Sequence, residues 1–315
     1  MVFISTKVIK GKKRYYLERS VRLVSGKIKK YSLYLPDTNT ETIEKSREIL
    51  NKKVEQNMLK NTCEYYTKNC VFTEENIQKI ETIKWNYKKL LQKLTPKQYQ
   101  DIIDRFTINF TYESNAIEGN SLTLKDVTMI LQENKAGGNK NLREVYETLN
   151  TRKALEFLFY NDIKITEKSI CELHEVLVKE TDVKTGYKKF PNFLLGRTIK
   201  TVPPEKVSEE MQKLLAWYHE NKTMHPLQKA AQFHALFEKI HPFEDGNGRV
   251  GRILLNAILR KHGYMPLIIR KTQRVAYFSA LQAADREHYE TLYRFLLEKY
   301  KKTYEHFFEI YMKYI

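Results

Sequence analysis

The sequence has 315 residues, of which 42% are hydrophobic and 30% charged, so the chain is long enough for one or two folded domains and lacks the composition of a disordered protein. No apolar run reaches the roughly 20 residues of a membrane-spanning helix. The three cysteines are odd in number and form no CxxC pair, which favours a reducing, cytoplasmic compartment over a disulfide framework. The net charge of +17 leaves nucleic acids, acidic proteins and anionic ligands open as partners.

The N-terminal segment is strongly basic, because its first 36 residues carry ten Lys or Arg and a single acid, Glu18. Within it, apolar and polar residues alternate over 21–23 and 31–35, on either side of Ser25-Gly26. This alternation around a turn predicts a β-hairpin in a small N-terminal sheet. We interpret the positive charge as a solvated face rather than as a nucleic-acid surface.

The chain after the hairpin has a predominantly helical pattern. A lysine-rich helical segment begins at Glu41, and Thr73 is placed to cap a second helix ahead of Glu74. Apolar residues recur at helical spacing over 96–116, 123–133, 141–160, 166–180, 205–221, 226–240, 248–262, 273–284 and 288–313. The segment 186–204 interrupts the helices with glycines, prolines and short apolar runs, and predicts a β-hairpin or a flexible flap.

The stretch "HPFEDGNGRVGR", from His241 to Arg252, lies between two of these predicted helices. Gly246 and Gly248 permit unusual backbone angles and the close approach of a ligand. The N–H groups at the start of the second helix can therefore converge on an anion. Arg249 and Arg252 share a helix face beside these groups, where guanidinium groups suit phosphate oxygens.

Two further side chains of this stretch point to a reaction. Asp245 is explained at an anion site if a divalent cation bridges it to phosphates, and His241 is suited to taking a proton near neutral pH. Together these groups predict phosphoryl or nucleotidyl transfer. The alternatives are an ordinary glycine-rich turn with surface arginines, and a zinc site at His225, His234 and His241, which the absence of an HExxH motif disfavours.

The stretch resembles the signature of the Fic (filamentation induced by cAMP) family, HxFx(D/E)GNGRxxR, and matches it at every fixed position. The likeness extends over about residues 107–297. Members of this family typically transfer AMP from ATP to a Ser, Thr or Tyr hydroxyl of a target protein and release pyrophosphate. The resemblance implies a helical Fic domain in which His241 is the catalytic base, Asp245 holds Mg²⁺ or Mn²⁺, and a flap at about 190–201 pairs with the target segment.

The resemblance also implies the nucleotide-binding residues, which are Gly246, Asn247, Gly248, Arg249, Arg252, Tyr277, Phe278 and Asp285. Phe243 would anchor the loop in the core. In the expected adenine pocket, Phe278 stands where members carry a second tyrosine and Asp285 stands where some carry asparagine. These two departures affect which nucleobase the pocket is expected to prefer.

A second stretch, "TYESNAIEGN", has two interpretations. Gly119 is a normal residue to end a helix, and Glu118 would then be an ordinary acid of the last turn. Ser114, Glu118 and Gly119 also match the inhibitory pattern (S/T)xxxE(G/N) of some Fic proteins. In those proteins the glutamate pairs with the last arginine of the signature, here Arg252, so that ATP binds in an unproductive pose.

The sequence thus predicts a mainly α protein, a Fic-type helical bundle with a β-hairpin flap, preceded by a small N-terminal β-hairpin or sheet and a helical connector. We expect domains at 1–85 and 86–315, with an inhibitory helix at about 105–119. The predicted function is auto-inhibited transfer of AMP from ATP to a protein target.

Several alternatives stay open. Removal of AMP and the use of another nucleotide are alternatives at the same site, and a basic nucleic-acid-binding module with a degenerate Fic site is an alternative of another class. Self-modification and a homodimer also stay open. No membrane partner is expected, and nucleic acid is disfavoured.

Overall fold

The computed structural model describes residues 2–160, 164–192 and 200–312. It divides into two compact units, Met1–Glu81 and Thr82–Ile315. In the part of the chain that the structure describes, no helix is long and apolar enough to cross a membrane.

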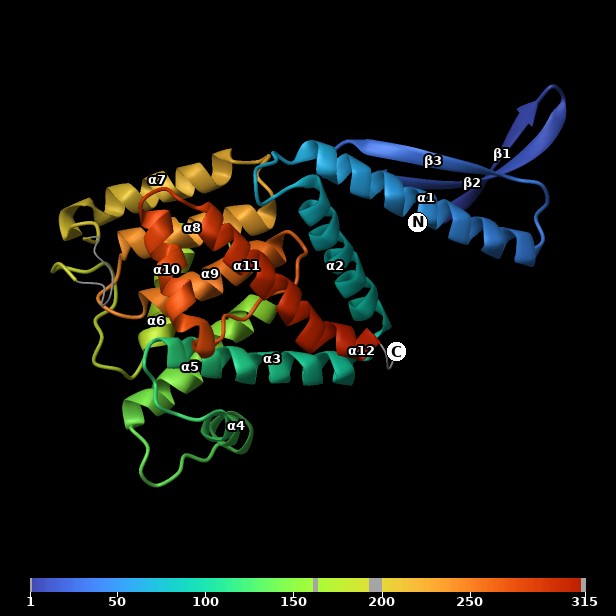
Figure 1. The fold of residues 1–315 in the computed structure, drawn as a ribbon. Helices are drawn as coiled ribbons and strands as arrows, with labels where there is room; N and C mark the ends of the chain where they lie inside the picture. The colour runs from blue at the N-terminus through green and yellow to red at the C-terminus, as the bar shows by residue number, and fades with distance from the viewer. Residues whose placement is uncertain (1, 161–163, 193–199, 313–315) are drawn as a thin grey trace. The chain divides into compact units, whose positions relative to one another are not determined.

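The first unit is built on a three-stranded antiparallel sheet in the order β1-β2-β3 (Figure 1). The strands are β1 (Val2–Ile9), β2 (Lys12–Arg22) and β3 (Ile28–Leu35). The predicted hairpin is confirmed as β2 and β3, whereas β1 was not predicted. β1 pairs with β2 along its whole length, across a turn at Lys10 and Gly11 in which both residues have positive φ angles.

One face of this sheet is covered by α1 (Thr40–Tyr65). Leu17 and Leu35 of the sheet pack with Leu50 and Val54 of the helix in a small separate core. The helix begins where the Asn39 side chain accepts a hydrogen bond of 2.8 Å from the N–H of Thr42, because such a cap satisfies a backbone donor that has no partner inside the helix. The next helix, α2 (Glu74–Lys93), follows the predicted cap Thr73.

The second unit is almost entirely helical, as predicted (Figure 1). Its longer helices are α3 (Pro96–Ile117), α4 (Leu124–Glu133), α5 (Leu142–Tyr160), α6 (Glu167–Val178), α7 (Val207–Glu220), α8 (Pro226–Ile240), α9 (Asn247–Lys261), α10 (Arg274–Asp285) and α11 (Glu290–Thr303). The chain then continues through a π-helical segment, Tyr304–Glu309, into α12 (Ile310–Met312).

The helices α8 and α9 form the centre of this unit, and α9 is buried over most of its length. Gly251, in the middle of α9, is what allows the two helices to approach closely. A Cβ atom at this position would lie 2.8 Å from both Glu238 Oε1 and His234 Nδ1 of α8. Any larger residue at 251 would therefore have to displace polar side chains that lie beside the signature loop.

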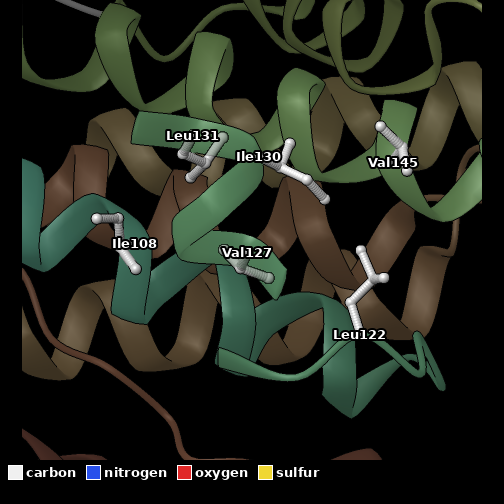
Figure 2. Close-up of a cluster of buried hydrophobic side chains, with 6 residues drawn as sticks. All are labelled: Ile108, Leu122, Val127, Ile130, Leu131 and Val145. Carbon is white, nitrogen blue, oxygen red and sulfur yellow. The ribbon is translucent and has the colours of Figure 1, made fainter. Parts of the chain in front are cut away.

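A satellite core fixes α3, the helix that carries the predicted inhibitory residues (Figure 2). Ile108 of α3 packs with apolar residues of α4, α5 and the segment before α4, namely Leu122, Val127, Ile130, Leu131 and Val145. The start of α4 is fixed by a reciprocal capping box between Thr123 and Asp126. A cavity of about 330 Å³ beside this core, lined by residues of α3, α4 and α5, includes none of the signature residues.

The predicted flap falls partly outside the described residues, because 193–199 are not among them. The described flanks, 186–192 and 200–203, contain no strand.

Candidate functional site

The signature loop between α8 and α9 is held by its own side chains. His241 ends α8 in the left-handed region, with φ 51°, and its N–H donates to the carbonyl of Phe237 at 2.9 Å. Phe243 is fully buried and stacks on the ring of His174 at 3.9 Å. Asn247 spans the loop, because its amide donates to the Phe243 carbonyl and accepts from the Phe243 N–H, both at 2.9 Å. The loop is therefore preorganised rather than shaped by a ligand.

The first turn of α9 faces the end of α3. Gly246 precedes the helix with φ 81°, and the backbone N–H groups of the first turn have no partner within the helix. A Cβ at Gly248 would collide with the carboxylate of Glu118. The Glu118 carboxylate thus lies against the helix N-terminus at which we expected an anion, and only glycine at 248 leaves room for it.

Arg252 is held by α3 on both sides of its guanidinium group. Its Nη1 lies 2.7 Å from Glu118 Oε1, while Nε and Nη2 donate to the hydroxyl and the carbonyl of Ser114 at 2.9 Å each. Burial acts to lower the pKa of Arg252, but the combined interactions with Glu118, Tyr277 and Glu238, of which Glu118 is the strongest, outweigh burial and raise the pKa. The arginine is 3% exposed and the Glu118 side chain 37%, so the pair is accessible from the carboxylate side.

Arg249 has a different environment on the other side of the first turn. It is buried, and its Nη1 and Nη2 lie 3.4 Å from Glu147 Oε1 and 3.7 Å from Asp245 Oδ2. Among the described residues, its Nε and Nη1 have no hydrogen-bond partner. A buried guanidinium group with unused donors is suited to the oxygens of a phosphate.

Asp245 is half-exposed at the mouth of the loop. Its Oδ2 lies 2.6 Å from Nη2 of Arg143, and its Oδ1 accepts from the Gly246 N–H at 2.6 Å. Within the described residues, no group of three His, Cys, Asp or Glu side chains could hold a metal ion. A lone carboxylate fits Mg²⁺ bound together with substrate phosphates, since this ion usually keeps only one or two protein carboxylates.

His241 has a carboxylate next to it that sequence reasoning missed. Its Nδ1 lies 3.9 Å from Oε2 of Glu238, a buried residue one turn earlier on α8. The spacing of three residues on one helix face was a visible signal, although an acid on an apolar helix face does not by itself indicate burial. At this distance the carboxylate does not hydrogen-bond to Nδ1, but its negative charge would stabilise the imidazolium that forms when His241 takes a proton.

The expected adenine-pocket residues lie together on α10, but they differ in accessibility. Tyr277 is buried, and its hydroxyl lies 2.6 Å from Nε2 of His234. Burial raises the pKa of Tyr277, so the hydroxyl is neutral. Phe278 is partly exposed, and Asp285 is buried. Of the three side chains, Phe278 is the most accessible to a base.

The three histidines of the disfavoured zinc site have separate surroundings. His225 accepts from the Leu227 N–H, His234 contacts Tyr277, and His241 lies beside Glu238. Each ring therefore has a structural contact of its own.

A second residue missed from the sequence is Lys188, which is buried and contacts residues on both sides of the segment predicted to be the flap. The Lys188 ammonium group donates to Asn192 Oδ1 at 2.8 Å, to Thr201 Oγ1 at 3.0 Å and to the Ile240 carbonyl at 3.4 Å. Its backbone N–H donates to the carbonyl of Pro242. Burial lowers the pKa of Lys188 to about 8. This lysine ties both flanks of the flap to the residues around His241.

Comparisons with known proteins show which family this chain resembles. Residues 164–259 match the model of the Fic/DOC family. The Drosophila melanogaster protein named "Protein adenylyltransferase Fic" is 33% identical over 198 residues, which is 61% of this chain and 40% of that protein. The D. sechellia and D. simulans proteins of the same name match equally. The chain thus spans about 40% of the length of the curated relatives it matches.

Solved structures show the same fold. A Fic-domain-containing signalling protein from Bacteroides thetaiotaomicron is 27% identical with a TM-score of 0.65, covering 71% of this chain and 93% of that chain. A Fic family protein from Desulfovibrio desulfuricans is 27% identical with a TM-score of 0.61, covering 75% of this chain and 74% of that one. Fic-1 from C. elegans, at 22% identity and a TM-score of 0.62, shares the fold over 89% of this chain and 80% of that one.

Proposed function

We propose that this chain, which carries a Fic/DOC domain, transfers AMP from ATP to a hydroxyl group of a protein target. The observation that carries the proposal is the arrangement at the start of α9, where first-turn N–H groups without a partner in the helix and the buried Arg249, whose Nε has no hydrogen-bond partner among the described residues, belong to the same loop and helix start as His241. An anion nest beside a base that works near neutral pH suits attack on a phosphate. The relatives named protein adenylyltransferase support the choice of AMP.

In this reaction the hydroxyl oxygen of the target forms a bond to the α-phosphorus of ATP, and the bond from that phosphorus to the pyrophosphate oxygen breaks. His241 accepts the proton of the attacking hydroxyl. The first-turn N–H groups of α9 and the guanidinium group of Arg249 stabilise charge on the phosphate oxygens. Arg252 has the γ-phosphate as its expected partner once Glu118 has left it.

Asp245 is the residue that would hold a divalent cation, Mg²⁺ or Mn²⁺. When bound, such an ion neutralises charge on the phosphates of ATP. Arg143 contacts Asp245 at 2.6 Å, so Arg143 would have to turn away when the carboxylate takes up the cation.

We propose that Glu118 inhibits this reaction by occupying Arg252 and the start of α9. An ion pair at about 4 Å is worth roughly 4 kcal/mol at an effective dielectric constant of 20, before the cost of desolvation. A net preference of ~2–3 kcal/mol for the paired state would reduce the competent population roughly 30- to 150-fold.

A second candidate, removal of AMP from a modified protein, is favoured by the accessibility of the Glu118 carboxylate, which is 37% exposed beside the α9 N-terminus. There it could position a water molecule. Glu118 would help this reaction and hinder AMP addition, so a single substitution separates the two.

The partner we propose is a protein segment with a hydroxyl side chain, held by the flap whose flanks Lys188 fixes. The chain itself, with 21 tyrosines, is a candidate for self-modification, and a homodimer is a candidate state in which Glu118 is released. Three cysteines that form no disulfide among the described residues support a cytoplasmic location.

The test uses purified wild type, Glu118→Gly and the Glu118→Gly/His241→Ala double variant with Mg²⁺ and ATP labelled at the α-phosphate. We expect label on the Glu118→Gly protein, little on wild type and none on a Glu118→Gly/His241→Ala double variant. Labelled UTP, CTP and GTP run in parallel and report the nucleotide choice. Equal labelling of wild type and Glu118→Gly would exclude inhibition by Glu118. To test AMP removal, a labelled Glu118→Gly protein is incubated with unlabelled wild type, and loss of label would favour that reaction.

A further inference from the structure

We propose that the face of the N-terminal sheet turned away from α1, here called the outer face, binds double-stranded DNA. Strand register assigns each side chain of the sheet to one of two faces, because neighbouring residues alternate and paired residues share a face. The α1-facing side holds Leu17, whereas its neighbour Glu18 points to the outer face.

The register divides the cations unequally between the two faces. Lys7 pairs with Arg14, Ser20 with Lys30, and Arg22 with Ile28. The outer face therefore carries Lys7, Lys12, Arg14, Arg22 and Lys30. The side that packs on α1 has three cations, of which Arg19 is bonded to Asn51 of α1. Five cations on one side of a short sheet form a concentrated positive surface.

The single acid of the sheet, Glu18, offsets only one of these five positive charges. Glu18 is buried under two outer-face lysines, with its carboxylate oxygens 3.2 Å from Lys7 and 2.6 Å from Lys30. Lys12, Arg14 and Arg22 are exposed on the same face. Solubility requires a polar outer face, but it does not require one in which cations so far outnumber acids.

Exposed aromatic side chains accompany the cations, which a merely solvated face does not need. Phe3 is 45% exposed and Tyr34 is 50% exposed. Tyr34 packs edge-on against Tyr16 at 5.6 Å, and Lys7 lies over the Tyr16 ring at 4.6 Å. Basic side chains with interleaved aromatics and hydroxyls are suited to phosphates at the edges of a groove and base edges between them.

The dimensions favour duplex DNA over other polyanions. The major groove, about 12 Å wide, admits a two-stranded β-ribbon, and two neighbouring strands of this sheet, about 4.8 Å apart, make such a strip. Strands that read DNA from this groove are a known mode of recognition. Arg14 and Arg22 are eight residues apart on β2, about 26 Å at 3.3 Å per residue. Cations towards both ends of the strip can therefore contact phosphates while Ser20 and Tyr34 face the bases.

The test measures binding of the full chain to a fluorescent DNA duplex of about 20 base pairs by anisotropy, without ATP, from about 50 to 200 mM salt. Five phosphate contacts predict a slope of log affinity against log salt of about −4.5. Arg14→Gln with Arg22→Gln is expected to reduce the slope by about two and the affinity at low salt by at least roughly ten-fold.

The matched control is Lys13→Gln with Lys29→Gln, which removes the same charge from exposed positions on the other face of the same sheet. This control should bind nearly as wild type does. Thermal unfolding checks that each variant folds, and Lys12→Gln with Arg22→Gln replaces the first pair if that pair does not. Three outcomes would each overturn the proposal. The outer-face variant and the control could lose the same affinity, or wild type could show no salt-dependent binding. Single-stranded RNA could also bind more tightly than the duplex.

Discussion

The outer face and the signature loop both present positive charge, but they do so under opposite conditions. Arg14 and Arg22 of the sheet are exposed, whereas Arg249 and Arg252 are each 3% exposed. Exposed charges interact weakly one at a time, are screened by salt, and act by their number. A buried guanidinium group is screened little and has one defined set of partners, so removing a single such group has a large effect. The same residue types thus serve long-range attraction in one region and a single chemical step in the other.

The largest expected effect comes from Arg249, a buried arginine whose Nε and Nη1 have no hydrogen-bond partner among the described residues. Arg249→Ala in the Glu118→Gly background should lower the rate of AMP transfer about 10²- to 10³-fold, because it removes donors aimed at the phosphate. The measurement is the initial rate of label incorporation from α-labelled ATP. Arg286→Ala, at an exposed arginine just after α10, is the control and should keep the rate. If Arg249→Ala and Arg286→Ala lowered the rate equally, the loss of any positive charge, rather than the position of Arg249, would be responsible.

The next effect comes from releasing the buried arginine that is already paired. Glu118→Gly should raise AMP transfer roughly 30- to 150-fold, and moderate salt should change this ratio little, since the pair is shielded from solvent on the arginine side. Glu133→Gly removes an acid at the end of α4 and serves as the control. If the ratio of the Glu118→Gly rate to the wild-type rate fell steeply with salt, the Glu118–Arg252 pair would be behaving as an exposed ion pair.

Lys188 extends the comparison to a buried cation held by neutral oxygens. Its pKa is lowered to about 8 by burial, while the unfolded chain keeps a value near 10.4. Between these two values the unfolded state binds more protons than the folded state, so the free energy of unfolding rises with pH. Relative to Lys188→Met, wild type should gain about 2 kcal/mol between roughly pH 8 and pH 9.5.

Urea unfolding at the two pH values measures this gain. Lys189→Met changes the exposed neighbour and should show no such difference from wild type. A constant difference between wild type and Lys188→Met across this range would mean that the ammonium group is not desolvated.

The smallest effect is expected when the outer face loses charge and catalysis is measured. Arg14→Gln with Arg22→Gln should leave the labelling rate of the Glu118→Gly protein within about two-fold, because exposed charges are screened by salt and interact weakly one at a time. The same proteins are assayed at low and at physiological salt. A large loss of rate at both salt concentrations would show that the sheet contributes directly to the reaction.

The prediction from sequence was most complete where the signals are local. Thr73 accepts a hydrogen bond from Asn76 at the start of α2, and the predicted hairpin is found as β2 and β3. Such features depend on side chains and backbone groups a few residues apart, so periodicity and capping reveal them. The strand β1 was missed because its alternation is interrupted by polar residues and becomes clear only in its pairing with β2.

The sequence by itself determined the helices and the composition of the signature loop, because both are written in neighbouring residues. The tertiary structure alone decided which distant groups meet that loop. Arg143 reaches Asp245 across 102 positions and Lys188 reaches the Ile240 carbonyl across 52. The tertiary structure also decided that Glu238 is buried beside His241 and that residue 251 must be a glycine. These contacts follow from how helices pack, and packing depends on the shape of the whole core rather than on any one segment.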